Sequence, residues 1–202
     1  MVREGIPFVL VPLFIALGFG LFLFWIPVAI FVAVAAFMAF FFRDPRRVAP
    51  TGPGLIVSAA DGRVTRIENN EETKLVSVFL SPLDVHINRS PIAGKITSIT
   101  YVEGKKTPAT SDNASLVNER NSLIIEGEDM TVTCTQIAGI LARRIVCWPR
   151  AGDNLERGQK FGLIKFGSRT DILMPANVEI AVRVGDRVKG GETIIGKLKV
   201  KN

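Results

Sequence analysis

The chain is poor in the residues from which most catalytic centres are built. Its 202 residues include one histidine, His86, and two cysteines, Cys134 and Cys147. A single imidazole excludes most metal sites and any mechanism that needs two histidines, so we expect no metal. The cysteines lack metal-ligand spacing, and a cytoplasmic domain would keep them reduced. We therefore expect buried free thiols.

Charge is absent from a long N-terminal run. Residues 5–42 contain no charged side chain over 38 positions. A helix of that length would reach about 57 Å, whereas a bilayer core is roughly 30 Å thick, so two short crossings fit better than one. Gly18 and Gly20 lie near the middle, and Trp25 suits a membrane interface. Because the run is too long for a signal peptide and lacks its cleavage pattern, we predict an apolar helical hairpin over 1–42, or else one span plus an interfacial helix.

The charges that flank this run indicate its orientation. Arg3 precedes it, and Arg43, Arg46 and Arg47 follow it. Cytoplasmic flanks carry an excess of Lys and Arg, and a hairpin places both flanks on one side. We therefore predict the cytoplasmic face of the cell membrane. The net charge of +6 suits an anionic membrane surface, and with no basic cluster interleaved with aromatics we expect no nucleic-acid partner.

The remainder of the chain has the composition of a β domain. Residues 43–54 form a Pro/Gly-rich linker, and 55–202 consist of short β-rich stretches separated by Gly, Pro, Asn and Asp. Only 137–145 has a pattern that could be helical. The domain is therefore predicted to be mainly β.

Two weak internal echoes refine this fold prediction. Segments 151–162 and 184–195 share a Gly-Asp pair and a second glycine six residues later, and 59–67 and 91–99 share a Gly-basic-apolar strand start. Similar Gly-Asp turns recur in barrel-sandwich folds such as biotinyl and lipoyl carriers. By that analogy we expect a quasi-duplicated, barrel-sandwich-like β domain, which by itself assigns no function.

The Gly167-Ser168 pair is the first candidate for chemistry. It lies in "FGLIKFGSRTDILMP", residues 161–175, between two apolar runs. Glycine tolerates backbone angles closed to other residues, so strain can be concentrated there. A hydroxyl directly after a strained glycine can attack the preceding carbonyl and turn an amide into an ester. The structural alternative is a plain turn with a solvated serine.

Polar residues elsewhere form a second group of candidates. In "FLSPLDVHINRSP", alternation in extended chain would place Asp84 and His86 on one face, where the carboxylate could orient the imidazole as a general base. The alternative is a surface histidine or a satisfied core histidine. Asp61 lies in an Asp-Gly turn pair and could hold a histidine in one tautomer. The polar island 118–121, which includes Glu119, is either a loop or part of a site.

Two other functional classes fit these residues less well. A serine hydrolase elbow reads Gly-x-Ser-x-Gly on a strand-to-helix turn, but here the residues two before and two after the serine are Phe166 and Thr170. A biotinyl or lipoyl carrier needs a lysine at a hairpin tip, and Lys165 lies inside a strand pattern. A membrane-anchored barrel-sandwich adaptor or carrier remains the non-enzymatic alternative.

An ordered set of motifs is similar to a known family. The chain resembles the short-form phosphatidylserine decarboxylase proenzymes, with archaetidylserine decarboxylases as close relatives. The resemblance covers nearly the whole chain, and "FGSR" is its most specific element. The motifs, in order, are "FFFRDPRR", "ADGRV", "FLSPLDVHINRSP", "NERN", "QIAGILARRIVC", "GDNLERGQKFGLIKFGSRTDILMP" and "VGDRVKGGETII".

This resemblance implies a definite chemistry. Such proenzymes cleave themselves at the bond that is Gly167–Ser168 here, giving a β chain, 1–167, and an α chain, 168–202, that stay associated. Ser168 becomes an N-terminal pyruvoyl group, the covalent cofactor. It forms a Schiff base with the amine of phosphatidylserine, accepts the electrons left by carbon dioxide and yields phosphatidylethanolamine. By family position, His86 is the proton donor.

One position departs from the family pattern. Long-form relatives carry a second histidine that pairs with the aspartate of the "DG" motif for self-cleavage, and this position is Arg89 here. Either His86 serves both steps, or cleavage depends on Asp61 and on strain at Gly167. Arg89, Asn88 and Glu119 are weaker candidates for substrate contacts. The residues leave open a homo-oligomer and the choice between diacyl and archaeol lipids.

Overall fold

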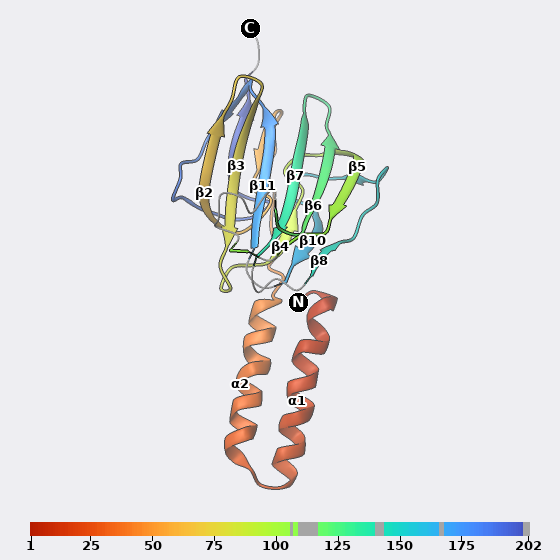
Figure 1. Ribbon diagram of the computed structural model, residues 1–202, viewed down its shortest axis with the longest axis vertical. Coiled ribbons are helices and arrows are strands. Elements are labelled where there is room, and N and C mark those ends of the chain that lie inside the picture. The colour runs from red at the N-terminus through yellow and green to blue at the C-terminus, as the bar shows by residue number, and fades with distance from the viewer. Residues whose placement is uncertain (106, 109–116, 140–143, 166–167, 200–202) are drawn as a thin grey trace. The chain divides into compact units, whose positions relative to one another are not determined.

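The computed structural model describes residues 1–105, 107–108, 117–139, 144–165 and 168–199 (Figure 1). Within it the chain forms two compact units, Met1–Arg46 and Arg47–Asn202. Each unit is described by itself. The predicted linker, 43–54, contains the division between them.

The first unit is a helical hairpin. It consists of η1 (Arg3–Gly5), α1 (Ile6–Leu21) and α2 (Trp25–Phe41), which lie side by side (Figure 1). The Val2 amide donates to the Phe42 carbonyl at 3.1 Å, which brings the two ends of the hairpin together. Gly5 permits this approach, because a Cβ there would lie 2.4 Å from the Phe42 Cβ. The predicted apolar hairpin is confirmed.

The hairpin exposes an apolar surface. By length and composition, the helical segment Arg3–Leu21 could cross a membrane, and α2 is an apolar helix of 17 residues. The turn between the helices exposes Phe22, Leu23 and Phe24, and side chains along both helices are also exposed. Exposed apolar area of this extent is typical of a membrane or protein contact. The unit is therefore a candidate for membrane association.

The second unit consists of three antiparallel sheets. The largest has the strand order β13-β2-β3-β11-β7-β6-β5-β9, and the smaller ones are β1-β14-β12 and β4-β10-β8. The prediction of a mainly β domain is confirmed. The strands are β1 (Leu55–Val57), β2 (Gly62–Asn69), β3 (Thr73–Leu80), β4 (Ile87–Arg89), β5 (Gly94–Val102), β6 (Arg120–Glu126), β7 (Thr131–Ala138), β8 (Ile145–Cys147), β9 (Asn154–Leu155), β10 (Lys160–Ile164), β11 (Ser168–Pro175), β12 (Val178–Ile180), β13 (Arg187–Val188) and β14 (Ile194–Leu198).

The strand order is that of a duplicated unit. Read from either end of the large sheet, a two-residue strand (β13 or β9) is followed by the two strands of a hairpin (β2-β3 or β5-β6) and then by a central strand (β11 or β7). The two small sheets repeat the correspondence, because β1-β14-β12 matches β4-β10-β8. The centre of the large sheet is therefore the β11–β7 pair.

Matching hydrogen bonds confirm the quasi-duplication. The Gly158 amide donates to the Ser90 carbonyl at 2.8 Å, and the Gly191 amide donates to the Ser58 carbonyl at the same distance. Both glycines have φ of 77°, in the left-handed region that favours glycine. Each serine hydroxyl donates to the carbonyl two residues further on. The two weak sequence echoes are thus the two copies of one turn.

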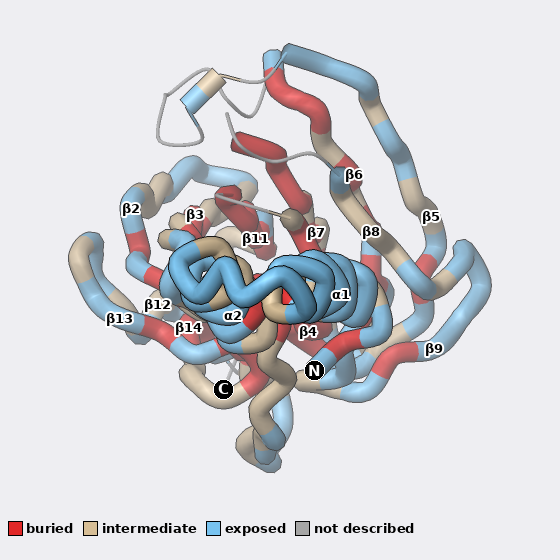
Figure 2. Tube along the Cα trace, turned by 90° about the horizontal axis from the view of Figure 1, so that it is seen from below, coloured by how far each residue is buried: buried red, intermediate tan, exposed pale blue. Residues whose placement is uncertain are grey.

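Burial concentrates along the central strands (Figure 2). Alternation along β11 places Ser168 and Thr170 on the same face as the core residue Ile172, and Arg169 and Asp171 on the other. The helix considered for 137–145 is wrong where the structure describes that stretch, because Ile137 and Ala138 belong to β7 and Ile145 to β8. Residues 140–143 lie outside the described part.

Candidate active site

Ser168 occupies a central and buried position. It is the first residue of β11 and pairs with Leu80 of β3 on one side and Ala138 of β7 on the other. The residue is fully buried, and among the described residues its Oγ has no hydrogen-bond partner. Leaving a buried hydroxyl unsatisfied costs about 1–3 kcal/mol, so each such group needs a physical explanation. Gly167 lies outside the described residues.

One hydrogen bond ties the segment of Ser168 to the segment of His86. The Asn88 side-chain amide donates to the Thr170 hydroxyl at 2.9 Å, and both residues are fully buried. Asn88 lies in β4 two residues after His86, and Thr170 lies two residues after Ser168. The bond therefore fixes the relative positions of the two chain segments that carry the candidate serine and histidine.

A chain of buried amides extends this contact into the sheet. Gln136 donates from Nε2 to Asn88 Oδ1 at 2.9 Å, and Asn121 donates to Gln136 Oε1 at 3.0 Å. Both side-chain ends of Asn88 are thus bonded within the protein, which gives it a role in holding β4 against β7 and β11. Substrate contact by Asn88 stays a prediction. Sequence reasoning placed Asn121 only in the polar island 118–121 and missed Gln136, although a polar residue at a core-facing position of an apolar strand is a recognisable signal.

Loss of the Asn88–Thr170 hydrogen bond should lower the stability of the fold measurably. Thr170→Val keeps the shape but removes the acceptor, so the Asn88 donor is left buried and unsatisfied. We expect the free energy of unfolding to fall by about 1–3 kcal/mol, or the midpoint of thermal unfolding by about 2 to 10 °C. Thr97→Val is the matched control, because Thr97 is exposed and should change stability by less than about 0.5 kcal/mol. Equal midpoints of thermal unfolding for the two variants would contradict a stabilising role of the Asn88–Thr170 hydrogen bond.

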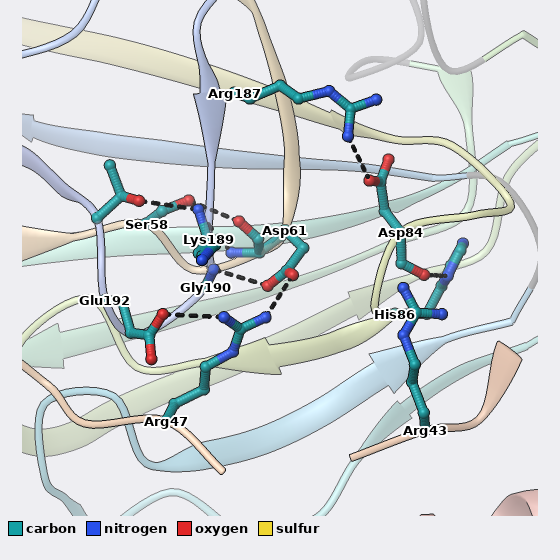
Figure 3. A network of polar contacts seen from close by, with 12 residues as sticks. Arg43, Arg47, Ser58, Asp61, Asp84, His86, Arg187, Lys189, Gly190 and Glu192 are labelled. Carbon is teal, nitrogen blue, oxygen red and sulfur yellow. Dashed lines mark hydrogen bonds and ion pairs between the residues drawn. The ribbon is translucent and has the colours of Figure 1, made fainter. Parts of the chain in front are cut away.

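His86 is buried and held by the backbone. Its Nδ1 lies 2.9 Å from the carbonyl oxygen of Asp84. A carbonyl only accepts, so Nδ1 carries the proton and the lone pair is on Nε2. The Asp84 carboxylate instead accepts from the Ser81 amide and hydroxyl at 2.8 and 2.7 Å, and Figure 3 shows it directed toward Arg187 and away from the imidazole. The expectation that this carboxylate orients the imidazole is wrong, because the chain turns at 81–84 rather than running extended.

Asp61 lies in a network of charges at the turn between β1 and β2 (Figure 3). Its Oδ1 accepts from the Gly190 amide at 2.8 Å, and its Oδ2 lies 2.6 Å from Arg47 Nη2. Arg47 also contacts Glu192 through Nη1 at 2.9 Å. Sequence reasoning treated Arg47 only as a basic flank of the apolar run. The role of Asp61 in cleavage stays a prediction.

The remaining predicted residues lie in two places. Arg89 is buried and donates from Nη1 to the Gly158 carbonyl at 3.0 Å, and a Cβ at Gly191 would lie 2.8 Å from its Cδ. It therefore packs between the two copies of the repeated turn. Glu119 accepts from the Tyr101 hydroxyl at 2.9 Å, and its backbone carbonyl accepts from the amide of Ala138, the partner of Ser168 in β7.

A buried ion pair stiffens β11 on its other face. Arg169 lies 2.8 Å from Asp171 through Nε and Oδ1 and donates from Nη2 to Oδ2 at 2.9 Å. The side chains are 3% and 8% exposed, so removing either would leave a buried charge without its partner. The strand that begins at Ser168 is therefore fixed by pairing on both edges and by side-chain contacts on both faces.

The thiols and metal-binding side chains are arranged as follows. Cys134 and Cys147 are free cysteines, and Cys134 is fully buried. Burial raises the pKa of both thiols, which keeps them protonated and unreactive. Within the described ranges, no three His, Cys, Asp or Glu side chains gather where they could hold a metal ion.

Comparison with known proteins identifies the family to which the chain belongs. The family model described as phosphatidylserine decarboxylase matches residues 34–196. The chain belongs to the phosphatidylserine decarboxylase family. Members of this family are carboxy-lyases, so the protein is a decarboxylase.

Three curated relatives named phosphatidylserine decarboxylase proenzyme illustrate the similarity. The protein from Symbiobacterium thermophilum is 48% identical over 204 residues, which cover 97% of this chain and 94% of that protein. The one from Geotalea uraniireducens is 42% identical, covering 96% and 95%. The one from Ruegeria pomeroyi is 44% identical, covering 97% and 94%. The similarity therefore spans both the helical hairpin and the β domain.

Proposed function

We propose that this decarboxylase is made as a proenzyme that cuts its own Gly167–Ser168 bond, and that it converts phosphatidylserine to phosphatidylethanolamine and carbon dioxide at the cytoplasmic face of the cell membrane. The observation that carries the proposal is the position of Ser168: it begins the central strand of a family member, and its buried hydroxyl has no hydrogen-bond partner among the described residues. Its neighbour in sequence, Gly167, supplies the carbonyl that this hydroxyl attacks.

The cleavage balances as an acyl shift followed by an elimination. The Ser168 Oγ bonds to the Gly167 carbonyl carbon as the peptide C–N bond breaks, which leaves an ester and a free amine. Loss of the Ser168 α-proton then breaks the Cβ–O bond and releases the Gly167 carboxylate. Water replaces the nitrogen of the resulting dehydroalanine, ammonia leaves, and residue 168 becomes a pyruvoyl group. Pairing of Ser168 on both edges of β11 supports this step, because the residue keeps its place as the adjacent bond breaks.

The residues around Ser168 fit the chemistry of that group. A pyruvoyl carbonyl supplies an acceptor for the substrate amine and for the electron pair that carbon dioxide leaves behind. His86 takes a proton on its Nε2 lone pair as the substrate ammonium loses one to become the attacking amine, and then gives this proton to the carbon that has lost its carboxylate. Its burial excludes water, which favours a carboxylate that leaves as neutral carbon dioxide.

The strand order supports lasting association of the two chains. The α chain, 168–202, would contribute β11 to β14. β11 pairs with β3 and β7, β13 pairs with β2, and β14 pairs with β1, all of which belong to the β chain. A cut at Gly167–Ser168 therefore leaves the α chain hydrogen-bonded to the β chain in two of the three sheets.

The apolar hairpin and the basic charge support the location. A phospholipid substrate stays in the bilayer, so the enzyme must reach it there, and the exposed apolar surface of α1 and α2 suits contact with acyl chains. The net charge of +6 favours a leaflet with anionic lipids.

A vesicle assay tests the proposal directly. Full-length protein is incubated with vesicles that contain phosphatidylserine labelled in its serine carboxyl group, and released carbon dioxide is measured. We expect release by protein that mass spectrometry resolves into two chains, and loss of activity on trapping with hydroxylamine or cyanoborohydride. Parallel vesicles with archaetidylserine assign the lipid backbone. Active protein that consists of one uncut chain would refute the proposal.

A further inference from the structure

We infer that Arg47 is a positioning residue for self-cleavage, and that its guanidinium holds the Asp61 carboxylate ionised and in one orientation. The inference rests on the proposed function, because it gives Asp61 a partner in the cleavage step. It also extends the cleavage machinery to the segment that follows the N-terminal helices. From sequence alone, Arg47 in this segment is interpreted as part of the basic flank of the apolar run.

The geometry is that of a guanidinium shared between two carboxylates. Arg47 approaches Asp61 through Nη2 at 2.6 Å and Glu192 through Nη1 at 2.9 Å. The Arg47 and Asp61 side chains are only 11% and 15% exposed, so solvent screens their contact less than that of a surface pair. The planar fork of arginine reaches both partners, which a lysine ammonium cannot do in the same way.

The second carboxylate joins the two future chains. Glu192 lies in the segment that becomes the α chain, whereas Arg47 and Asp61 lie in the β chain. Burial acts to raise the pKa of Glu192, but the hydrogen bond and charge of Arg47, together with the Val48 amide and the Lys189 charge, hold this pKa below its ordinary value. Arg47 thus connects the turn that carries Asp61 to the segment that becomes the α chain.

The internal duplication shows that the fold does not require these charges. In the other copy of the turn, Ala93 stands where Asp61 stands, and Gln159 stands where Glu192 stands. That copy is closed by the same glycine-to-serine hydrogen bond and pairs β5 with β9 as β2 pairs with β13. The repeated turn forms with no carboxylate at either position. Asp61 and Glu192 are therefore not needed to form the turn, which supports a chemical role for them.

The charged groups around Asp61 explain why a guanidinium is needed. Position 89 holds an arginine whose Nη1 donates to Gly158, so it supplies no imidazole for the carboxylate. Lys189 and Glu192 lie close in sequence to Gly190, whose amide donates a hydrogen bond to Asp61 (Figure 3). Arg47 is a cation in direct contact with this carboxylate, and an adjacent cation lowers the pH at which a carboxylate takes up its proton.

The test compares Arg47→Met with Arg46→Met. Both remove one positive charge, but Arg46 is exposed. Full-length chains are synthesised cell-free into phospholipid vesicles, translation is stopped, and the uncut fraction is followed over time in buffers of graded pH. We expect the parent and Arg46→Met to cleave alike. We expect Arg47→Met to cleave about tenfold more slowly or worse at the acidic end, with the whole rate profile moved to higher pH.

Two further variants separate positioning from folding. Arg47→Lys keeps the charge and should restore much of the rate and the pH profile, and Glu192→Gln removes the second anchor and should give an intermediate rate. A lowered unfolding temperature with an unmoved pH profile would overturn the inference, as would cleavage of Arg47→Met at the parent rate. A parent chain that never cleaves would instead overturn the proposed function.

Discussion

Replacing Ser168 with alanine should leave the chain whole at 22.0 kDa and abolish decarboxylation. Without Oγ, no ester can form at the Gly167 carbonyl, so the bond persists and residue 168 never gains a ketone. The substitution removes an oxygen that bonds to no described residue, so we expect the fold to be unharmed or slightly stabilised. Intact-mass measurement and carbon dioxide release give the two readouts.

Ser77 offers a matched control for this substitution. It lies in β3, is fully buried, and its hydroxyl likewise has no hydrogen-bond partner among the described residues. Its backbone pairs with Asp171 in β11, so the two serines lie in neighbouring strands. Ser77→Ala should be cut and active at the parent level. Decarboxylation by uncut Ser168→Ala protein would remove this serine from the mechanism.

Replacing His86 with glutamine should separate turnover from maturation. Loss of a positioned general acid lowers rates by about 10²–10⁴-fold, and we expect a fall of this size in carbon dioxide released per cut chain. We expect the two chains still to appear, because we infer that the cleavage step depends on the charges around Asp61. The measurement is the cut fraction by mass spectrometry together with the rate per cut chain.

Arg187→Gln is the control for the His86 variant. Arg187 is exposed and contacts the Asp84 carboxylate at 3.6 Å, so it perturbs the same turn without touching the imidazole. It should leave both readouts near the parent. Full turnover per cut chain by His86→Gln would exclude His86 as the proton donor, and an uncut chain would mean that the same imidazole serves both steps.

The features that sequence predicts well are those that depend on neighbouring residues. The charge-free run 5–42 specifies a helical hairpin because apolar helices need no partner to satisfy their backbone. The β composition and the repeated Gly-Asp turns specify a duplicated β domain, since each glycine there adopts backbone angles that other residues avoid. Ser168 can be singled out as a candidate because the Gly-Ser pair and the two apolar runs that flank it are adjacent in the sequence.

The features that sequence misses depend on pairing between distant segments. Alternation suggested that the Asp84 carboxylate faces His86, but Pro82 lies in a turn that directs this carboxylate back to Ser81. The bond between Asn88 and Thr170 joins residues 82 positions apart, and nothing in either local stretch specifies it. Arg47 is 14 residues from Asp61, and its proximity to the apolar run suggested a different purpose.

The central place of β11 imposes an order of events on maturation. A fragment of 35 residues supplied separately would have to slip between β3 and β7 and displace their hydrogen bonds with water along the way. An intact chain inserts that strand as part of its own folding. Under the proposed function, the Gly167–Ser168 bond survives until the sheet is complete, so that scission follows assembly and is a one-way step.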